Sequence, residues 1–397
     1  MKVSLSKAEL QLLVREHENW RAENCINLIP SENVTSSNVQ ALLSSDLGHR
    51  YTSRSGFYAG TRYIDEIEAL GEKIATEVFH SEFADLRPIS GHLADLIFLA
   101  SFTRPGDKIM CVGPEDGGYP GISSEGAPKF LGLKVIYLPF NRKYMNIQTN
   151  KAVELIQQKQ PRVVLLGASL FLFPHPIRKI AEATADVGAT LGYDGSHVLG
   201  LIAGGEFQDP LKEGAQIVTG STHKSFFGPQ GGIILANSEC EGVIRKNVHP
   251  AFVDNTHWNR IAALTMALIE MKHFGREYAR QVVRNAKALA KALYEHGLPA
   301  ICKNYDYTRS HQIFLDYGWK KGKLIAEKLE RANIIVDCGV RIGTCEVTRR
   351  GMNEKEMELI AELIARVLIG NETPNRVKLD AIKLRKQFPK LSCCFGS

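Results

Sequence analysis

Short hydrophobic segments typical of buried strands alternate with amphipathic segments typical of helices through the middle of this chain. Strand patterns cover residues 85–89, 108–112, 133–138, 162–166, 189–194, 216–218 and 232–235, and helical patterns cover residues 62–79, 93–103, 150–158 and 177–187. Neighbouring parallel strands need a crossover connection of a dozen or more residues, and the helical segments are long enough to supply it. The alternation therefore predicts an α/β fold with a mainly parallel sheet and helices on both faces.

The length of the chain, 397 residues, exceeds the size that one hydrophobic core usually serves. We expect an N-terminal arm over residues 1–50, a large domain over residues 51–260 and a smaller α/β domain over residues 261–397. The arm has a helical pattern in which Ser6 and Glu9 are placed as a capping box. A long helical region at 258–297 leads into the small domain, whose patterns predict strands at 312–315 and 334–336 and helices at 323–332 and 353–368.

The distribution of charge and apolar residues argues against a membrane protein and against a nucleic-acid-binding protein. No apolar run approaches the ~20 residues of a membrane span, and the N-terminus carries charges where a signal peptide needs an apolar stretch. The net charge of +6 is mild. The basic tail after residue 375 lacks the interleaved aromatic residues of single-strand binders, so we interpret it as a solvated helix face.

The cysteines indicate a reducing environment. All eight are scattered without CxxC spacing, which predicts neither a disulfide framework nor a metal site. We therefore expect a cytoplasmic protein. The adjacent Cys393 and Cys394 are interpreted as incidental thiols of a frayed tail.

Two polar residues follow two of the predicted strands. Asp194 ends the strand at 189–194, and Lys224 follows the strand at 216–218 in a run of hydroxyls and glycines. The segment between them has room for one crossover, so both side chains are expected at the carboxyl edge of the sheet, where α/β proteins bind ligands. A buried amine beside a carboxylate suits pyridoxal phosphate, because the lysine forms an aldimine and the carboxylate keeps the ring nitrogen protonated.

Two weaker motifs fit the same chemistry, and each has a plainer alternative. Ser90, Gly91 and His92 follow a predicted strand and open a helix, where free backbone N–H groups hold a phosphate; the alternative is a simple helix cap. Arg341 lies on a glycine-flanked strand of the small domain and suits bidentate capture of an amino-acid carboxylate. Its alternative is a surface salt bridge.

Motifs along nearly the whole chain resemble the serine hydroxymethyltransferase family, whose members are pyridoxal-phosphate enzymes with the aspartate-aminotransferase fold, fold type I. The motifs are residues 28–36 (LIPSENVTS), 173–176 (FPHP), 194–201 (DGSHVLGL), 221–224 (STHK) and 341–344 (RIGT). Residues 167–171 (GASLF) and 226–230 (FFGPQ) are most similar to the archaeal branch.

The resemblance implies roles for the residues around the cofactor. Lys224 forms the internal aldimine, Asp194 holds the pyridine nitrogen, and His197 and Ser169 approach the phenolic oxygen. The phosphate is expected at the helix start with His92, and its implied ligands are Ser90, Gly91, Ser221 and His223.

The resemblance also implies how the substrate is held. Ser31 and Arg341 bind the carboxylate of a small amino-acid substrate, and Tyr51 and Tyr58 reach across from a partner subunit. A site shared in this way implies an isologous homodimer.

The chain departs from the family pattern in several places. The family's glutamate acid/base, in a Tyr-Ala-Glu-Gly segment, aligns with Ser53, and its ring-stacking histidine aligns with Tyr119. Tyrosine can stack on the ring, but it cannot relay a proton near neutral pH without a large pKa shift. The loop before Arg341 is short, and residues 254–256 (DNT) stand where a neighbouring subunit offers a glycine pair to the phosphate. These changes leave the cofactor chemistry intact and argue against a tetrahydropterin one-carbon carrier.

Several functions therefore stay open. The main hypothesis is an enzyme that makes or breaks the Cα–Cβ bond of serine or a related β-hydroxy amino acid, with His197, His223 or a water as the base. The alternatives are a pterin-independent threonine-type aldolase, a transaminase or racemase, and a weakly active homologue that binds pyridoxal phosphate.

Overall fold

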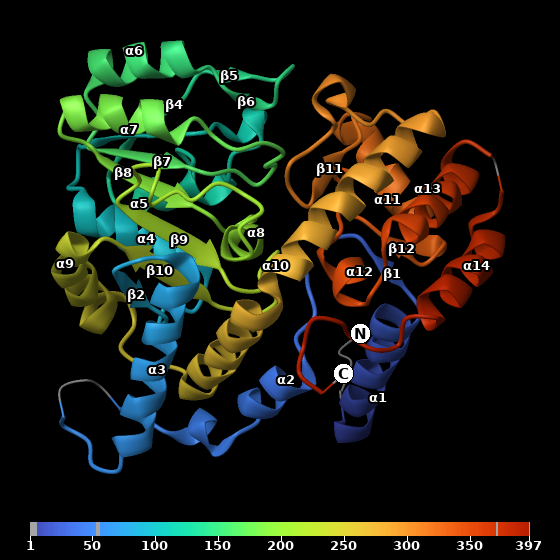
Figure 1. The fold of residues 1–397 in the computed structure, drawn as a ribbon, viewed down its shortest axis with the longest axis horizontal. Coiled ribbons are helices and arrows are strands. Elements are labelled where there is room, and N and C mark those ends of the chain that lie inside the picture. Colours follow the sequence, from blue (N-terminus) through green and yellow to red (C-terminus); the bar gives the residue numbers. More distant parts are fainter. Residues whose placement is uncertain (1–5, 53–55, 371, 397) are drawn as a thin grey trace.

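The central element of the fold is a seven-stranded sheet with helices on both faces, which the computed structural model describes over residues 6–52, 56–370 and 372–396 (Figure 1). Its strands, in spatial order, are β2 Phe83–Asp85, β10 Gly232–Ala236, β9 Ile217–Ser221, β8 Thr190–Asp194, β7 Val163–Leu166, β3 Lys108–Cys111 and β4 Lys134–Tyr137. The strands from β9 to β4 run parallel, and β10 is antiparallel to both of its neighbours. The predicted mainly parallel α/β sheet is confirmed.

Alternate side chains of each strand enter two different cores, because successive residues of a strand point to opposite faces. In β7, Val163 and Leu165 join the core under one group of helices, while Val164 and Leu166 join the core under the other. Strands buried on both faces read as continuous apolar runs, which is why the sequence revealed them. The helices around the sheet are α3 Arg62–Phe79, α4 Gly91–Phe102, α5 Ala127–Phe130, α6 Thr149–Lys159, α7 Ile177–Asp186, α8 Leu199–Ala203 and α9 Glu241–Lys246.

One strand and one helix start earlier than the sequence predicted. The strand expected at 85–89 is Phe83–Asp85, because the backbone and side chain of Arg87 both donate to Asp85 Oδ1 at 3.0 Å and turn the chain out of the ladder. Helix α4 begins at Gly91 rather than residue 93, because the Ser90 hydroxyl accepts the Leu93 N–H at 3.0 Å and caps the helix. Gly91 therefore lies in the first turn of a helix that points its N-terminus at the sheet edge.

A second core lies beside the sheet and is joined to it by the long helix α10 Trp258–Glu295 (Figure 1). The first half of α10 packs on the sheet, and its second half packs in the second core. The other elements there are β11 Gln312–Phe314, α11 Trp319–Arg331, β12 Ile334–Ile335, β13 Arg341–Gly343, α12 Cys345–Arg349, α13 Glu354–Leu368 and α14 Pro374–Lys386. We call this part of the molecule the C-terminal region. Strands β11 and β13 pair antiparallel, with Phe314 opposite Arg341.

The N-terminal segment lies against the C-terminal region. Strand β1 Ile26–Asn27 pairs in parallel with β12, and Ile26 and Leu28 are fully buried in the second core. The capping box at Ser6 and Glu9 is confirmed at the start of α1 Lys7–His17, yet no side chain of that helix is buried. The segment continues through α2 Ser37–Leu43, and a separate hairpin is formed by β5 Phe140–Asn141 and β6 Asn146–Ile147. The division into an arm and two domains stays a prediction.

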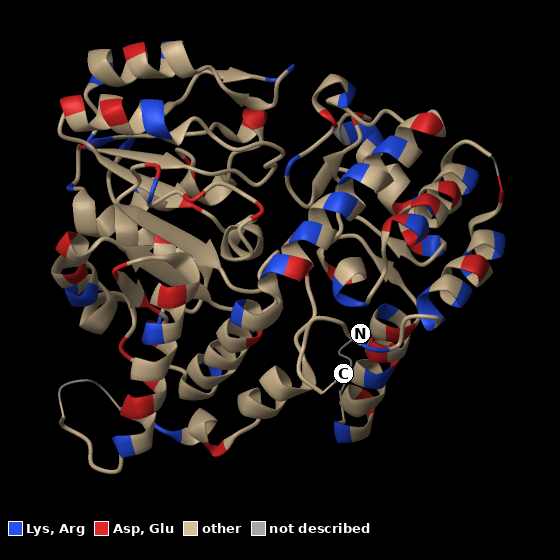
Figure 2. Ribbon diagram, viewed as in Figure 1, with Lys and Arg blue, Asp and Glu red and all other residues tan. Residues whose placement is uncertain are grey.

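The C-terminal tail differs in part from its predicted state. Figure 2 marks the basic residues along α14, of which Arg376, Lys383 and Lys386 are exposed. Arg385 is buried, however, and donates to the carbonyls of Ala22 and Phe388. The frayed tail expected near Cys393 is wrong, because the carbonyl groups of Ser392 and Cys393 accept hydrogen bonds from the fully buried Arg349 guanidinium. A buried cation needs such acceptors, which holds the tail in place. Among the described helices, none is long and apolar enough to cross a membrane.

Candidate active site

The strands that carry Asp194 and Lys224 are neighbours in the sheet. Asp194 is the last residue of β8 and lies opposite Thr219 of β9, and β9 ends at Ser221, three residues before Lys224. Because the two strands run parallel, their carboxyl ends meet at the same edge, as the spacing predicted. This edge faces the C-terminal region near the middle of α10, where the Tyr278 hydroxyl donates to the Ser225 carbonyl at 2.8 Å (Figure 1).

The Lys224 side chain is largely withdrawn from water and has no close partner. Within the described residues, its amine forms no hydrogen bond and no ion pair, and only burial and charges at a distance act on it. Burial lowers the pKa of Lys224, the negative charges of Asp194 and Asp95 oppose this effect, and Arg341 adds to it. A lowered pKa favours the neutral amine, which is the nucleophilic form that condenses with an aldehyde.

Asp95 is a second carboxyl group at this edge that the sequence analysis missed. It lies on α4 and is 1% exposed, and its Oδ1 accepts a hydrogen bond from the Thr219 hydroxyl. Its Oδ2 is buried without a hydrogen-bond partner in the described chain. Burial and the neighbouring Asp194 raise the pKa of Asp95 well above its usual value, which favours the protonated form of this carboxyl group. One signal could have revealed it: Asp95 follows Gly91 by one helical turn, on the same face.

The start of α4 forms a cradle with two serine hydroxyls. A Cβ atom on Gly91 would lie 2.3 Å from Ser221 Oγ and 2.8 Å from Ser196 Oγ, so only glycine leaves room between them. The Ser196 hydroxyl also accepts the Ser221 N–H at 3.0 Å. Free N–H groups at a helix N-terminus together with hydroxyl donors suit a phosphate. Ser196 was also missed, although it belongs to the recognised motif at 194–201.

This arrangement fits pyridoxal phosphate on three separate points. The Gly91 cradle has the donors and the space for a phosphate, the buried Asp194 carboxylate can pair with a protonated ring nitrogen, and the unpaired amine of Lys224 can condense with the aldehyde. His223, two residues after the cradle residue Ser221, has its Nδ1 buried without a partner in the described chain.

Tyr119 lies close to the same carboxyl groups. Burial raises its pKa, and the charges of Asp95 and Asp194 raise it further. His92 is exposed and packs edge to face on the Tyr119 ring, with the centroids 5.8 Å apart. Tyr119 is therefore placed to cover an aromatic ligand at this edge, and His92 supports it from outside.

His197 is fully packed and is contacted by a glutamine that the sequence analysis missed. The Gln312 side-chain nitrogen lies 2.8 Å from His197 Nδ1, and the same nitrogen donates to the Ser169 carbonyl at 3.1 Å. Burial lowers the pKa of His197 well below its usual value, and Lys224, Arg341, His311 and His223 lower it further. His197 is therefore a neutral imidazole. No sequence signal marked Gln312, which lies 115 residues after His197.

Arg341 reaches from β13 to the sheet. Its Nη1 donates to the Ser169 carbonyl at 2.7 Å, and its Nε pairs with Asp337 Oδ2 at 2.8 Å. Asp337 belongs to the short loop before Arg341 that the sequence singled out. The salt bridge considered as an alternative therefore exists, yet it engages one edge of the guanidinium and leaves Nη2 without a partner in the described chain.

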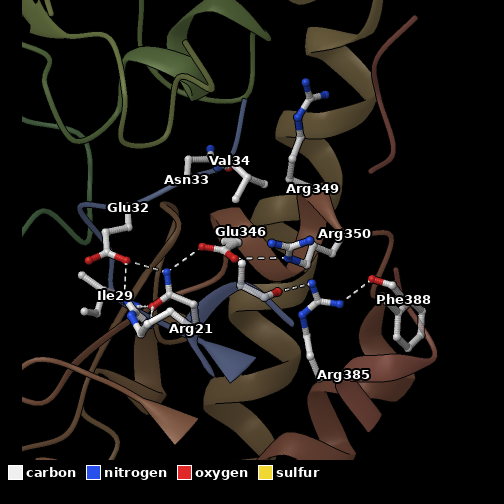
Figure 3. Close-up of polar contacts among 12 residues, drawn as sticks. Arg21, Ile29, Glu32, Asn33, Val34, Glu346, Arg349, Arg350, Arg385 and Phe388 are labelled. Carbon is white, nitrogen blue, oxygen red and sulfur yellow. Dashed lines mark hydrogen bonds and ion pairs between the residues drawn. The ribbon is translucent and has the colours of Figure 1, made fainter. Parts of the chain in front are cut away.

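Ser31 and His223 line one cavity of about 550 Å³. Its floor is a polar network in which Asn27 donates to Glu32 at 2.7 Å and to Glu346 at 2.6 Å, while Arg21 pairs with Glu32 (Figure 3). Charges of opposite sign are paired throughout this network. A ligand in the cavity can therefore reach Ser31 and His223. The charged side chains of the network are already paired with one another.

Tyr51 and Tyr58 lie away from this edge. The Tyr51 hydroxyl donates to Asp254 at 2.7 Å, and the Tyr51 and Tyr58 rings meet edge to face at 5.1 Å. Residues 56–61 form a loop before the N-terminal end of α3 (Figure 1). Ser53, which stands at the position of the family glutamate, lies outside the described residues.

A solved structure with the same fold is the L-threonine transaldolase from Pseudomonas fluorescens in the internal aldimine state. It superposes with a TM-score of 0.90 at 28% sequence identity, covering 97% of this chain and 92% of that one. The fold and the lysine-centred site define a pyridoxal-phosphate-dependent transferase of fold type I.

Comparison with related sequences leads to the same class of enzyme. The family model for serine hydroxymethyltransferase matches residues 5–364. Serine hydroxymethyltransferases of Methanopyrus kandleri and Methanocaldococcus jannaschii are 46% and 42% identical, over 97% and 96% of this chain and 94% of each relative. The chain belongs to the serine hydroxymethyltransferase family, as the motifs predicted.

Proposed function

We propose that this protein interconverts serine and glycine by making and breaking the Cα–Cβ bond of serine. One observation carries the proposal: the half-buried Lys224, whose amine has no partner in the described chain, lies at adjoining strand ends with Asp194, and Arg341 of the C-terminal region reaches the same edge. The amine suits an aldehyde cofactor, and the arginine suits the carboxylate of an amino acid. Membership of the serine hydroxymethyltransferase family supports serine as the substrate.

Bound pyridoxal phosphate supplies an electron sink that lets one bond to the substrate α-carbon break. In this proposal, Asp194 keeps the ring nitrogen protonated through charge pairing, and Tyr119 covers one face of the ring. The phosphate is held by a set of donors around the start of α4, namely Ser90, Gly91, Ser196, Ser221 and His223. Asp95 stays neutral, so that the ring meets one negative charge rather than two.

The substrate carboxylate binds at Arg341 and Ser31. The Nη2 atom of Arg341 is available, while Asp337 and the Ser169 carbonyl hold the rest of the guanidinium in place. Ser31 contributes a hydroxyl from the cavity that it shares with His223. Holding the carboxylate at two points orients the bond that is to break.

The proton of the substrate β-hydroxyl must be removed when the Cα–Cβ bond breaks. Burial, with a smaller contribution from Lys224, lowers the pKa of His223 to about 4, and His197 is neutral for the same main reason. Each imidazole therefore has one unprotonated nitrogen at neutral pH. The Ser53 position offers no carboxylate for this task.

A homodimer is part of the proposal. Helix α1 exposes Leu10, Leu13 and Val14 on a helix with no buried side chain, and Tyr58 is 38% exposed. Large apolar side chains exposed in this way favour burial against another protein surface. A second copy of the chain would cover them and would bring Tyr51 and Tyr58 to the site.

Complementation tests the shared site. Subunits with Lys224→Ala and subunits with Tyr58→Ala are expected to be inactive or weak alone and to regain activity when mixed, because one of the two hybrid sites is then intact. Light scattering gives the mass of each species. A monomeric, active enzyme would refute the dimer and leave the reaction intact.

A threonine-type aldolase is the second candidate. The superposed structure is a threonine transaldolase, and the loop before Arg341, which the resemblance connects with a pterin, is short. A threonine-type aldolase releases glycine from threonine without a pterin carrier.

Glycine release separates the two candidates. It is measured from serine and from allo-threonine, each with and without a tetrahydropterin. Serine cleavage stimulated by the pterin supports the proposal, and cleavage of allo-threonine alone supports the aldolase. If neither substrate is cleaved while the α-proton still exchanges with deuterium, the enzyme is a racemase or transaminase.

A further inference from the structure

We propose that Gln312 fixes His197 in the tautomer that carries its proton on Nε2, which makes His197 a hydrogen-bond donor to the cofactor and prevents it from acting as the base. This inference deepens the proposed function and rests on it for the identity of the cofactor. It assigns Gln312 as a positioning residue on β11, a strand outside the sheet that carries Lys224.

The orientation of the Gln312 amide is set by two backbone groups. Its Oε1 accepts the N–H of Phe171 at 2.8 Å, and an N–H group can only donate. Its Nε2 donates to the carbonyl of Ser169 at 3.1 Å, and a carbonyl can only accept. Exchanging the amide oxygen and nitrogen would break both bonds, so the amide is held with its nitrogen toward His197.

The second N–H of Gln312 Nε2 is then directed at His197 Nδ1, at 2.8 Å. A nitrogen that receives a hydrogen bond must present a lone pair, so Nδ1 is unprotonated. A neutral imidazole has one proton, which therefore lies on Nε2. In the described chain Nε2 has no hydrogen-bond partner, and it is free to donate to a ligand.

Protonation of both nitrogens is opposed by burial of the ring and by four basic neighbours. Lys224, Arg341, His311 and His223 all disfavour a positive charge on His197. His311 stacks nearly parallel to it at 5.8 Å, and its Nε2 lies 3.0 Å from the Pro30 carbonyl, so that nitrogen carries the proton of His311. A proton on His197 Nδ1 would also face the N–H of Gln312. His197 therefore stays neutral, with a donor on its ligand side.

The chemical consequence concerns the choice of base. The resemblance places His197 near the cofactor's phenolic oxygen, where an Nε2–H group stabilises negative charge on that oxygen. A nitrogen that already carries the proton cannot take one from the substrate hydroxyl. The base is then His223 or a water molecule, and His197 is excluded.

The same contacts couple the C-terminal region to the cofactor site. Gln312 on β11 and Arg341 on the paired strand β13 both donate to the Ser169 carbonyl, at 3.1 Å and 2.7 Å. The Ser169 carbonyl therefore accepts one hydrogen bond from each of the paired strands β11 and β13, and β13 carries the substrate-binding arginine. When β11 and β13 pack against the sheet edge, Gln312 donates to His197 Nδ1 and leaves the Nε2–H group of His197 to donate to the cofactor.

Nitrogen NMR of the holoenzyme labelled with ¹⁵N-histidine tests the inference, and His197→Asn identifies the His197 resonances. The expected result is an unprotonated Nδ1 and a protonated Nε2 that persist across the neutral pH range. Gln312→Glu is expected to reverse this state, because a carboxylate at the same place can only accept a hydrogen bond and therefore favours a protonated Nδ1. Gln312→Met is expected to release the ring into a mixture of tautomers.

Activity and stability provide the control. Gln208 is also a buried glutamine, with hydrogen bonds to His175 and Tyr193, but it does not touch His197. Gln312→Met is expected to lower kcat by about tenfold, the loss of one well-placed hydrogen bond, with KM little changed. Both variants lose a buried hydrogen-bonded amide, so Gln208→Met and Gln312→Met are expected to lower the melting temperature by similar amounts. Only Gln208→Met is expected to leave kcat and the His197 tautomer unchanged.

A protonated Nδ1 in the wild-type enzyme would overturn the inference, as would an unchanged tautomer in Gln312→Glu. Neither result bears on whether serine is the substrate. Conversely, an enzyme that binds the cofactor but does not cleave serine would refute the proposed function and leave the NMR result valid.

Discussion

The two sides of the candidate site are built in different ways. On the sheet side, Asp194 and Asp95 are buried and Lys224 is half-buried, and the lysine amine and one Asp95 oxygen have no partner in the described chain. On the C-terminal side, Gln312 and Arg341 are held by hydrogen bonds whose donors and acceptors are nearly all assigned. The sheet side thus leaves its reactive groups without hydrogen-bond partners, whereas the C-terminal side holds its side chains in one orientation. Substitutions on the first side should therefore abolish chemistry, and those on the second should change binding and orientation.

The largest effect is expected for Lys224→Ala. Without the amine, the cofactor cannot be linked to the protein, and kcat should fall by about a thousandfold or more. The visible absorption band of the bound cofactor should disappear as well. Lys272→Ala is the matched control, since Lys272 forms an exposed ion pair with Glu77 and should leave both properties unchanged. A coloured, active Lys224→Ala enzyme would refute the role of the sheet side.

The two buried aspartates should differ sharply. Asp194→Asn removes the negative charge that pairs with the ring nitrogen, and kcat should fall by roughly a hundredfold or more. Asp95→Asn replaces a neutral carboxyl group by a neutral amide of the same shape, so kcat should change little. Steady-state kinetics on both variants check this contrast, and equal losses would show that Asp95 is ionised.

Asp95 should also make stability depend on pH. Its pKa is raised in the folded protein, so above the unfolded-state pKa the folded state holds a proton that the unfolded state has lost. The free energy of unfolding therefore falls as pH rises from the unfolded pKa towards the folded pKa. Asp95→Asn should remove this slope and be more stable than wild type at neutral pH but not at low pH. Urea unfolding at several pH values measures it, and parallel curves for the two proteins would contradict it.

A smaller effect is expected on the C-terminal side for Arg341→Lys. Lysine keeps the charge but loses the planar fork, so KM for serine should rise by about tenfold to a hundredfold. The absorption of the bound cofactor should stay as in wild type, because the sheet side is intact. If kcat collapses while KM is unchanged, Arg341 acts on the chemistry rather than on binding.

The smallest effect is expected for Asp337→Asn. The ion pair with Arg341 is partly exposed, and such pairs contribute little on their own. KM should rise by about two- to fivefold as the guanidinium loses one restraint. A change as large as that of Arg341→Lys would indicate that Asp337 itself contacts the substrate.

The sequence predicted the sheet side better than the C-terminal side, for a physical reason. Buried parallel strands leave continuous apolar runs, and the polar residues that end them, Asp194 and Lys224, stand out against those runs. The cradle at Gly91 was found for the same reason, because it opens a helix after a strand. The fold, the family and the cofactor could therefore be predicted from the sequence.

The missed residues depend on contacts between distant parts of the chain. Asp95 lies within an apolar helix, and its role follows from its hydrogen bond with Thr219 and from the nearby charge of Asp194. Gln312 meets His197 only because β11 folds back onto the sheet edge. The strand predicted at 85–89 was displaced by the local Arg87 to Asp85 contact, which periodicity does not report. Such pairings need the three-dimensional fold.

The most direct test of the central claim is to locate the cofactor on the chain. The purified enzyme is reduced with borohydride, digested, and analysed by peptide mass spectrometry for a pyridoxyl group on lysine. The account predicts the group on Lys224, at the strand edge that Asp194 and Asp95 share. A pyridoxyl group on any other lysine, or none in an enzyme that cleaves serine, would contradict it.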